Sequence, residues 1–165
     1  MPNKVYINPE TAITWSDAGA TNVIDLGGLS DGAVRVGAQH DLGSSARSDM
    51  YEWRLKIDGF DSAPVVGETI DLYFAYADAS DNTLIDGDVG TSDAAGATAD
   101  LPNLQYAGSV VVQTTTAGDD LVASGIIQIA SRYVSPVVHN NTADALLGTS
   151  DDHWVYLTPV PAEVQ

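Results

Sequence analysis

The most restrictive feature of the sequence is a strict alternation of apolar and charged residues across Met50–Asp58. One side of an extended chain would carry Tyr51, Trp53, Leu55 and Ile57, and the other Glu52, Arg54, Lys56 and Asp58. Successive side chains of a β-strand leave opposite faces, whereas a helical period would scatter these charges around its axis. The stretch therefore predicts a β-strand with one face on a hydrophobic core and the other in water.

Further stretches extend this prediction to the whole chain. Thr69–Ala77 repeats the alternation, Gln105–Thr116 also reads as a strand, and no segment has a convincing amphipathic helical pattern. Nineteen of the 23 acids are Asp, which together with 15 Gly and seven Pro favours many turns. We predict an all-β protein, an antiparallel β-sandwich of about eight strands, with jelly-roll topology favoured and residues 1–165 in one domain.

The C-terminal quarter predicts a hairpin of two strands, Gly125–Val138 and His153–Pro159, followed by a proline-bearing tail, Pro159–Gln165. The second strand is apolar on both sides, with Val155 and Leu157 on one and Trp154 and Tyr156 on the other. Such a strand is either enclosed by the fold or presented to a partner. Pro136 lacks a backbone N–H, so we place it on a sheet edge or at a bulge.

Charge and composition exclude several classes of function. The formal charge is −17, and no basic residue occurs between Lys56 and Arg132, where 12 acids lie. A surface of this sign repels phosphate backbones, so no nucleic-acid partner is expected. The chain has no cysteine and starts without a long apolar run. We therefore expect no disulfide, signal peptide or membrane association, and synthesis in a cytoplasm.

Residues 78–100 read as a long irregular acidic loop, in which Asp81, Asp86 and Asp88 are weak candidates for binding calcium. Clustered carboxylates on a flexible loop can supply the oxygen ligands that Ca²⁺ needs. The Asp spacing does not match an EF-hand, however, and a solvated acidic loop is the favoured interpretation.

No catalytic motif stands out. Serine, histidine and aspartate are all present, but the sequence has no G-x-S-x-G nucleophile elbow. The three histidines, His40, His139 and His153, lack metal-binding spacing, and only four glutamates are available as glycosidase acids. We predict a protein that is not an enzyme and needs no cofactor or metal, with its histidines at the surface or in an interface.

Two segments resemble the C-termini of small structural proteins of tailed bacteriophages. They are Arg132–Asn141, RYVSPVVHNN, and Asp151–Pro161, DDHWVYLTPVP, with the ending Glu163-Val164-Gln165. The resemblance implies a jelly-roll capsid decoration (cement) protein on the virion surface, with itself, as a homotrimer, and the major capsid protein as partners. The interface residues that we expect on this basis are Arg132, Tyr133, Pro136, Trp154, Tyr156, Pro159 and Pro161.

Two alternatives stay open. A carbohydrate-binding sandwich module would use exposed aromatic side chains, such as Trp154 and Tyr156, to stack on sugars. A phage tail accessory subunit would share the C-terminal resemblance but act elsewhere on the particle.

Overall fold

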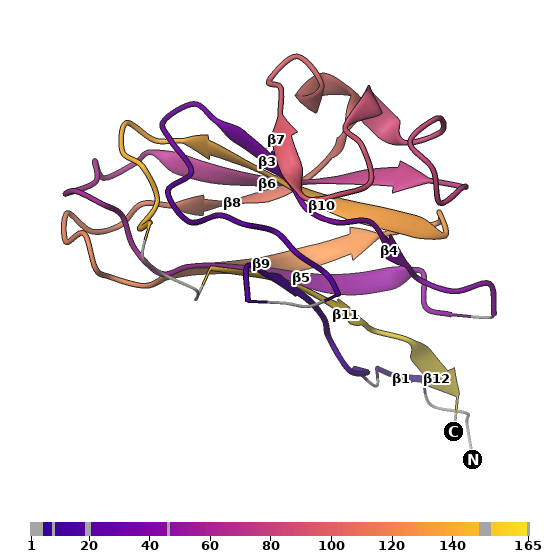
Figure 1. Ribbon diagram of the computed structural model, residues 1–165. Helices are drawn as coiled ribbons and strands as arrows, with labels where there is room; N and C mark the ends of the chain where they lie inside the picture. Colours follow the sequence, from indigo (N-terminus) through magenta and orange to yellow (C-terminus); the bar gives the residue numbers. More distant parts are fainter. Residues whose placement is uncertain (1–4, 8, 19–20, 46, 149–152, 165) are drawn as a thin grey trace.

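A computed structural model describes residues 5–7, 9–18, 21–45, 47–148 and 153–164, and the side chains of 9–161 within those ranges. Two antiparallel sheets pack face to face (Figure 1). The strands are β1 (Val5–Ile7), β2 (Ile13–Ser16), β3 (Val34–Val36), β4 (His40–Asp41), β5 (Met50–Ile57), β6 (Thr69–Ala77), β7 (Ala94–Gly96), β8 (Gln105–Val111), β9 (Leu121–Gln128), β10 (Tyr133–Asn141), β11 (Trp154–Pro159) and β12 (Ala162–Val164). Two short 3₁₀ helices are η1 (Asp86–Asp88) and η2 (Leu101–Asn103).

The strand order is that of a jelly roll. The β11 sheet has the order β2-β11-β5-β9, and the β10 sheet has the order β7-β3-β10-β6-β8, with β4 also paired to β10. Without the short strands β4 and β7, eight strands remain in the sandwich, and in chain order the sheets read 1-8-3-6 and 2-7-4-5. Two Greek keys wound together give this order. The predicted fold class, an antiparallel β-sandwich of jelly-roll type, is confirmed.

The core lies between the two sheets and is built from the alternating positions. Every apolar residue of β5 that the sequence assigns to the core face, such as Trp53 and Leu55, is at most 3% exposed. Ile70, Leu72 and Phe74 of β6 face them from the other sheet and are fully buried. Burial of this interior is the main stabilising contribution to the sandwich.

The predicted C-terminal hairpin is wrong. Gly125–Val138 is not one strand, because β9 ends at Gln128 and β10 begins at Tyr133. The two halves belong to different sheets, so the chain crosses the sandwich at this corner. His153–Pro159 corresponds to β11, which pairs with β2 and β5 instead of β10.

The acidic stretch 78–100 is also more ordered than its sequence indicates. It contains η1 and β7, and β7 extends the β10 sheet by pairing with β3. Ile85 and Val89 pack with Leu101 and Val137 in a second hydrophobic cluster on the outer side of this sheet. Figure 1 shows the segment covering that side of the sandwich. A bidentate ion pair anchors it, in which Arg35 donates from Nε to Asp93 Oδ1 at 2.7 Å and from Nη2 to Asp93 Oδ2.

A two-stranded ribbon stands outside the sandwich. β1 and β12 pair with each other in antiparallel register, Val5 opposite Val164 and Ile7 opposite Ala162. Neither strand pairs with the two larger sheets, and Figure 1 shows the ribbon projecting beyond the end of β11. In the described part of the chain, no helix is long and apolar enough to cross a membrane.

Candidate functional site: the outer face of the β11 sheet

The outer face of the β11 sheet carries the aromatic pair that the sequence singles out. Val155 and Leu157 point into the core and are fully buried, whereas Trp154 and Tyr156 are half-buried on the opposite side. Their rings lie nearly parallel, at 7°, with centroids 5.7 Å apart. The two-sided apolar character of β11 thus has a physical explanation, because one side builds the core and the other forms an aromatic stack at the surface.

Charged side chains of β5 lie beside the aromatic pair. In the sheet register Lys56 is opposite Trp154, and Arg54 is opposite Tyr156. Arg54 Nη2 lies 3.2 Å from Glu52 Oε1 in an exposed ion pair. Glu52, Arg54, Tyr156 and Thr158 line a shallow hollow of about 250 Å³ with Ala12. This face therefore combines an aromatic stack with donors and acceptors, a composition suited to binding another molecule rather than to proton transfer.

Two of the other expected interface residues, Arg132 and Tyr133, do not join this patch. Arg132 and Tyr133 are in or next to β10, in the opposite sheet. Arg132 donates to both carboxylate oxygens of Asp41, at 2.8 and 2.6 Å, and its guanidinium lies 4.9 Å from the centre of the Tyr133 ring. The hydrogen bond from Arg132, with a second from the Gly43 N–H, lowers the pKa of Asp41 to about 2.

Pro136 is not available to a partner, since it is buried in β10 between β6 on one side and β3 with β4 on the other. Its carbonyl accepts from the Gly37 N–H at 2.8 Å, at the break between β3 and β4. The register to β10 shifts by one residue across this break. The missing N–H of Pro136 therefore falls at an irregularity of the sheet, as expected of proline. The predicted contribution of Pro136 to an interface is excluded by its burial.

Pro159 and Pro161 lie where β11 leads into the ribbon, and both are half-buried. The Pro159 carbonyl accepts from the Glu10 N–H at 3.0 Å. The segment that precedes β2 is therefore hydrogen-bonded to the end of β11, next to the point where the ribbon begins.

The calcium candidates do not converge. Asp81 accepts hydrogen bonds from the N–H and the hydroxyl of Thr83, and Asp86 accepts from the Tyr76 N–H at 3.1 Å. Asp88 is exposed and has a φ of 54°. Among the residues that the structure describes, no group of three or more histidines and carboxylates could hold a metal ion.

A serine, an aspartate and a histidine do meet on the outer face of the β10 sheet, but in an order unsuited to catalysis. Ser109 donates to Asp71 at 2.5 Å, and His139 Nδ1 lies 3.9 Å from the other oxygen of Asp71. The aspartate occupies the middle strand of this row. Ser109 and His139 are thus two strands apart, roughly 10 Å, so the histidine cannot take the serine proton.

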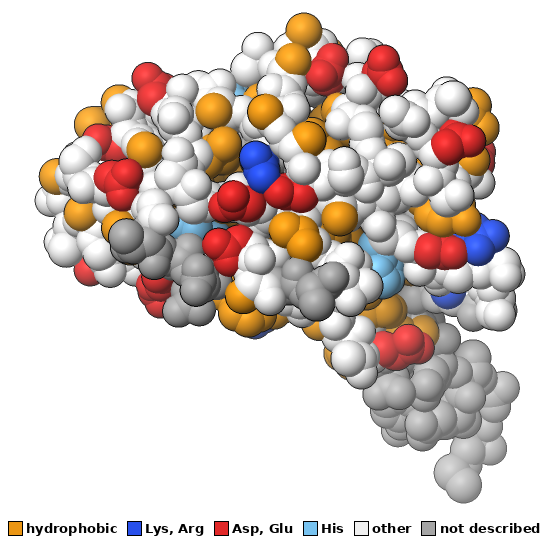
Figure 2. Space-filling view, viewed as in Figure 1, with side chains coloured by type: hydrophobic (Ala, Val, Ile, Leu, Met, Phe, Trp, Pro, Cys, Tyr) orange, Lys and Arg blue, Asp and Glu red, His pale blue; other side chains and the backbone are white. Residues whose placement is uncertain are grey.

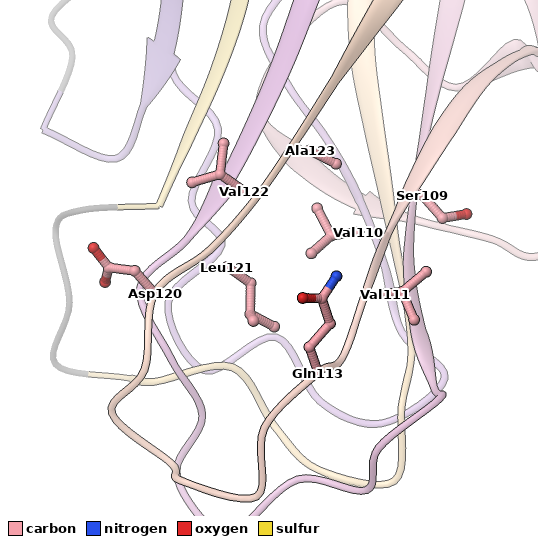
Figure 3. A pocket seen from close by; sticks show the side chains of 8 residues that line it. All are labelled: Ser109, Val110, Val111, Gln113, Asp120, Leu121, Val122 and Ala123. Carbon is pink, nitrogen blue, oxygen red and sulfur yellow. The ribbon is translucent and has the colours of Figure 1, made fainter.

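Sequence reasoning missed the open side of the sandwich, where the edge strands β8 and β9 face each other. Val110, Gln113 and Leu121 line a groove between them (Figure 3). Tyr106 and Val111 of β8 and Val122 and Ile126 of β9 are between 45 and 58% exposed. The available signal was the lack of any charged residue in either strand. Elsewhere acidic side chains are scattered over the surface, as one face shows in Figure 2.

Comparisons with known proteins give no family. No family model matches the chain, and no curated protein is significantly similar to it. Among solved structures, murine APRIL at pH 5.0 is 8% identical with a TM-score of 0.39, and the alignment covers 96% of this chain and 99% of that one. The C-terminal domain of EclA, a sugar-binding protein, is 10% identical with a TM-score of 0.34, covering 94% and 77%.

A third structure holds the CBM22-1 and GH10 modules of the Clostridium thermocellum xylanase 10B complexed with xylohexaose. It is 12% identical with a TM-score of 0.35, covering 96% of this chain and 24% of that one. Similarity at these TM-scores carries no information about what this protein binds.

Proposed function

We propose that this protein is a non-enzymatic structural component of a tailed-bacteriophage virion, which binds the outer capsid surface and stabilises the lattice as a decoration protein does. The observation that carries the proposal is the course of β11. This strand holds Trp154 and Tyr156 at the surface and then leads directly into the β1–β12 ribbon beyond the sandwich. Isolated two-stranded ribbons are marginally stable in water, so this one would gain from docking on a partner.

Two further features support the proposal. The residues of β10, β11 and β12 carry the resemblance to tailed-phage structural proteins, and the formal charge of −17 favours solubility at the high copy number needed before assembly. The partners would be the major capsid protein and further copies of this chain. A tail accessory subunit is the alternative within the same class of proteins. Labelling the protein on whole phage particles would show whether it lies on the head or on the tail.

The test is co-sedimentation with capsids of the encoding phage, prepared from a strain that lacks this gene. The intact protein should pellet with the capsids. A chain that lacks residues 159–165 and a Trp154→Ala/Tyr156→Ala variant should bind at least tenfold more weakly, because both remove the surface around β11. Leu84→Ser, a change at an equally apolar but distant loop residue that is 62% exposed, should bind normally.

Thermal melting of each variant shows whether weak binding reflects an unfolded sandwich. Absence of binding by the intact protein, or full binding by both β11 variants, would overturn the proposal.

A carbohydrate-binding module is the second candidate, and a different observation favours it. The Trp154–Tyr156 stack adjoins the hollow lined by Arg54, Glu52 and Thr158, so a sugar could stack on one of these half-buried rings and hydrogen-bond to its neighbours. Binding to a glycan array, abolished by Trp154→Ala and unchanged by Leu84→Ser, would support this function. Repeating the array with a chelator would show whether calcium takes part.

A further inference from the structure

We propose that two copies of this protein associate through β9, edge to edge, around a two-fold axis at Ser124, so that the two β11 sheets form one continuous eight-stranded sheet. The inference deepens the proposed function, which requires a surface for self-association, and it replaces the expected three-fold contact by a two-fold one.

β9 is an edge strand without the usual protection. It pairs with β5 on one side, and no described segment pairs with its other side. Natural sheet edges are blunted by charges, prolines, bulges or shortness. β9 has eight residues, with sequence LVASGIIQ, and none of these devices. By contrast, β8 has a bulge at Ala107, β7 has three residues, and residues 22–24 cover the end of β2.

The free backbone groups of β9 can be assigned from the ladder to β5. Ile129 donates to the Asp49 carbonyl at 2.8 Å, and hydrogen-bonded pairs alternate with non-bonded pairs along an antiparallel ladder. Gly125 and Ile127 therefore bond to β5, whereas the N–H and C=O groups of Val122, Ser124 and Ile126 point away from it. The bonding of Met50 agrees with this assignment. Its carbonyl accepts from the Val160 N–H on the β11 side of β5, so it does not bond to β9.

These outward groups match a second copy of the same strand. With Ser124 opposite its own counterpart, Val122 of one copy pairs with Ile126 of the other, and all three pairs are of the hydrogen-bonded type. Val122 and Ile126 also share the outer face of the sheet, where they are 57 and 58% exposed. Val122 also lies at the edge of the groove drawn in Figure 3. The pairing would therefore cover both side chains in cross-strand contacts.

The distribution of charge allows a second copy to approach at this edge. Two molecules that each carry a formal charge of −17 repel each other over most of their surfaces. None of the 23 acids lies within β8 or β9. Asp120, just before β9, lines the groove and lies 3.4 Å from Lys56 Nζ. In the Ser124 register it falls opposite Gln128 of the second copy, so two copies can approach here without opposing carboxylates. The adjacent residues of β5, Lys56, Arg54 and Glu52, carry both signs and add no net repulsion of consequence.

The first test is the mass of the purified full chain by sedimentation equilibrium, for the natural sequence and for Ser124→Pro. The proline removes an N–H that faces the open edge and leaves the ladder to β5 intact, so the sandwich should melt at nearly the same temperature. We expect a dimer that becomes a monomer in Ser124→Pro, whereas Leu84→Lys, at a distant exposed site, should remain dimeric. A monomeric natural chain, or any oligomer that Ser124→Pro leaves unchanged, would overturn the inference.

The second test checks the register. Val122→Lys/Ile126→Lys places like charges opposite each other across the axis and should dissociate the dimer. Val122→Lys/Ile126→Glu places opposite charges there and should restore it. Equal dissociation of both variants would reject the Ser124 axis. Because these measurements need no capsid, their failure is distinct from a failure of capsid binding by the natural protein.

Discussion

His153 shows how one buried polar residue is accommodated at the start of β11. It is 1% exposed, its Nδ1 accepts from the Asp58 N–H at 3.0 Å, and its Nε2 donates to the Leu147 carbonyl at 3.1 Å. This tautomer satisfies both ring nitrogens with a neutral ring. Burial lowers the pKa of His153 below its ordinary value because the charged form would lose its hydration.

This environment predicts a loss of stability in mild acid. The folded pKa of His153 is lower than the unfolded value of about 6.5, so the unfolded chain binds the proton more readily. The stabilisation is complete above pH 6.5 and is lost as the pH falls toward the folded pKa, by up to about 1.4 kcal/mol per pH unit. Urea unfolding of the natural protein between pH 5 and 8 should show this slope, and His153→Gln should flatten it.

His40 supplies the control for this prediction, since burial also lowers its pKa. Each histidine should account for its own part of the slope, so His40→Gln should reduce the slope while leaving the part that is due to His153. An unchanged slope in His153→Gln would contradict the assignment.

The surface or interface position predicted for His153 was wrong, although the sequence held a signal for burial. His153 falls on the same side of β11 as Val155 and Leu157, and the residues of that side form the core. The alternation correctly divided β11 into its two sides. It could not reveal that the Asp58 N–H and the Leu147 carbonyl would satisfy an imidazole there, because both partners come from other segments of the chain.

At the scale of elements, Trp53 joins the two sheets through a pair of glycines. The indole of this β5 residue packs on Gly125 of β9 and against Gly108 of β8, in the opposite sheet. A Cβ on Gly125 would lie 2.7 Å from Trp53 Nε1, and a Cβ on Gly108 would overlap the six-membered ring. Both glycines are therefore required by the volume of the indole.

Replacing either glycine by alanine should destabilise the fold. Overpacking of a filled core typically costs about 1–3 kcal/mol, so we expect Gly108→Ala and Gly125→Ala each to reduce the free energy of unfolding by that amount. Gly118→Ala is the matched control, since no atom lies within 4 Å of its added Cβ. Urea denaturation measures all three. If Gly108→Ala and Gly125→Ala were as stable as Gly118→Ala, the two sheets would be able to move apart around the added methyl group at little cost.

Elements with a clear alternation were predictable, and those fixed by distant contacts were not. β6 has the predicted bounds, and β5 ends one residue earlier than expected. The corner at residues 129–132 was missed because apolar alternation continues on both sides of it. β7 and η1 have no periodic signal, and their positions depend on tertiary contacts such as Arg35 with Asp93 and Ile85 with the second cluster.

For the whole molecule, the imbalance of charge is the dominant electrostatic feature. Each of Arg35, Arg54, Lys56 and Arg132 already lies within 4 Å of a carboxylate, and Arg47 donates to the carbonyls of Ala130 and Ser131. Six bases cannot balance 23 acids, so a net repulsion among the carboxylates remains. Self-repulsion of this kind destabilises a compact state.

Added salt should therefore raise the melting temperature. Screening becomes effective near 0.1 M, where the Debye length is about 10 Å, and sodium and potassium chloride should act alike. Differential scanning calorimetry at increasing salt measures the effect. Calcium chloride at matched ionic strength should give no additional stabilisation. An extra rise with calcium alone would instead indicate specific binding by carboxylates, with Asp81, Asp86 and Asp88 as the first candidates for substitution.

The sandwich was predictable from strand patterns and turn composition, but its connectivity was not. Alternation shows that a strand has a core face and gives no information about its neighbours in the sheet. β10 and β11 are consecutive in the sandwich, and a hairpin was the simplest expectation for them. The jelly roll instead places β10 between β3 and β6 and β11 between β2 and β5.

This arrangement sets the order of events during synthesis. The central strand of each sheet leaves the ribosome after the strands that flank it, so β2 and β5 must wait for β11, and β3 and β6 for β10. A nascent chain can pair β5 with β9 and β6 with β8, but the core closes only once residues near Pro159 have emerged. Such non-local pairing folds slowly and leaves apolar strands exposed in the meantime. Translation speed and chaperone supply are therefore expected to limit the yield of soluble protein.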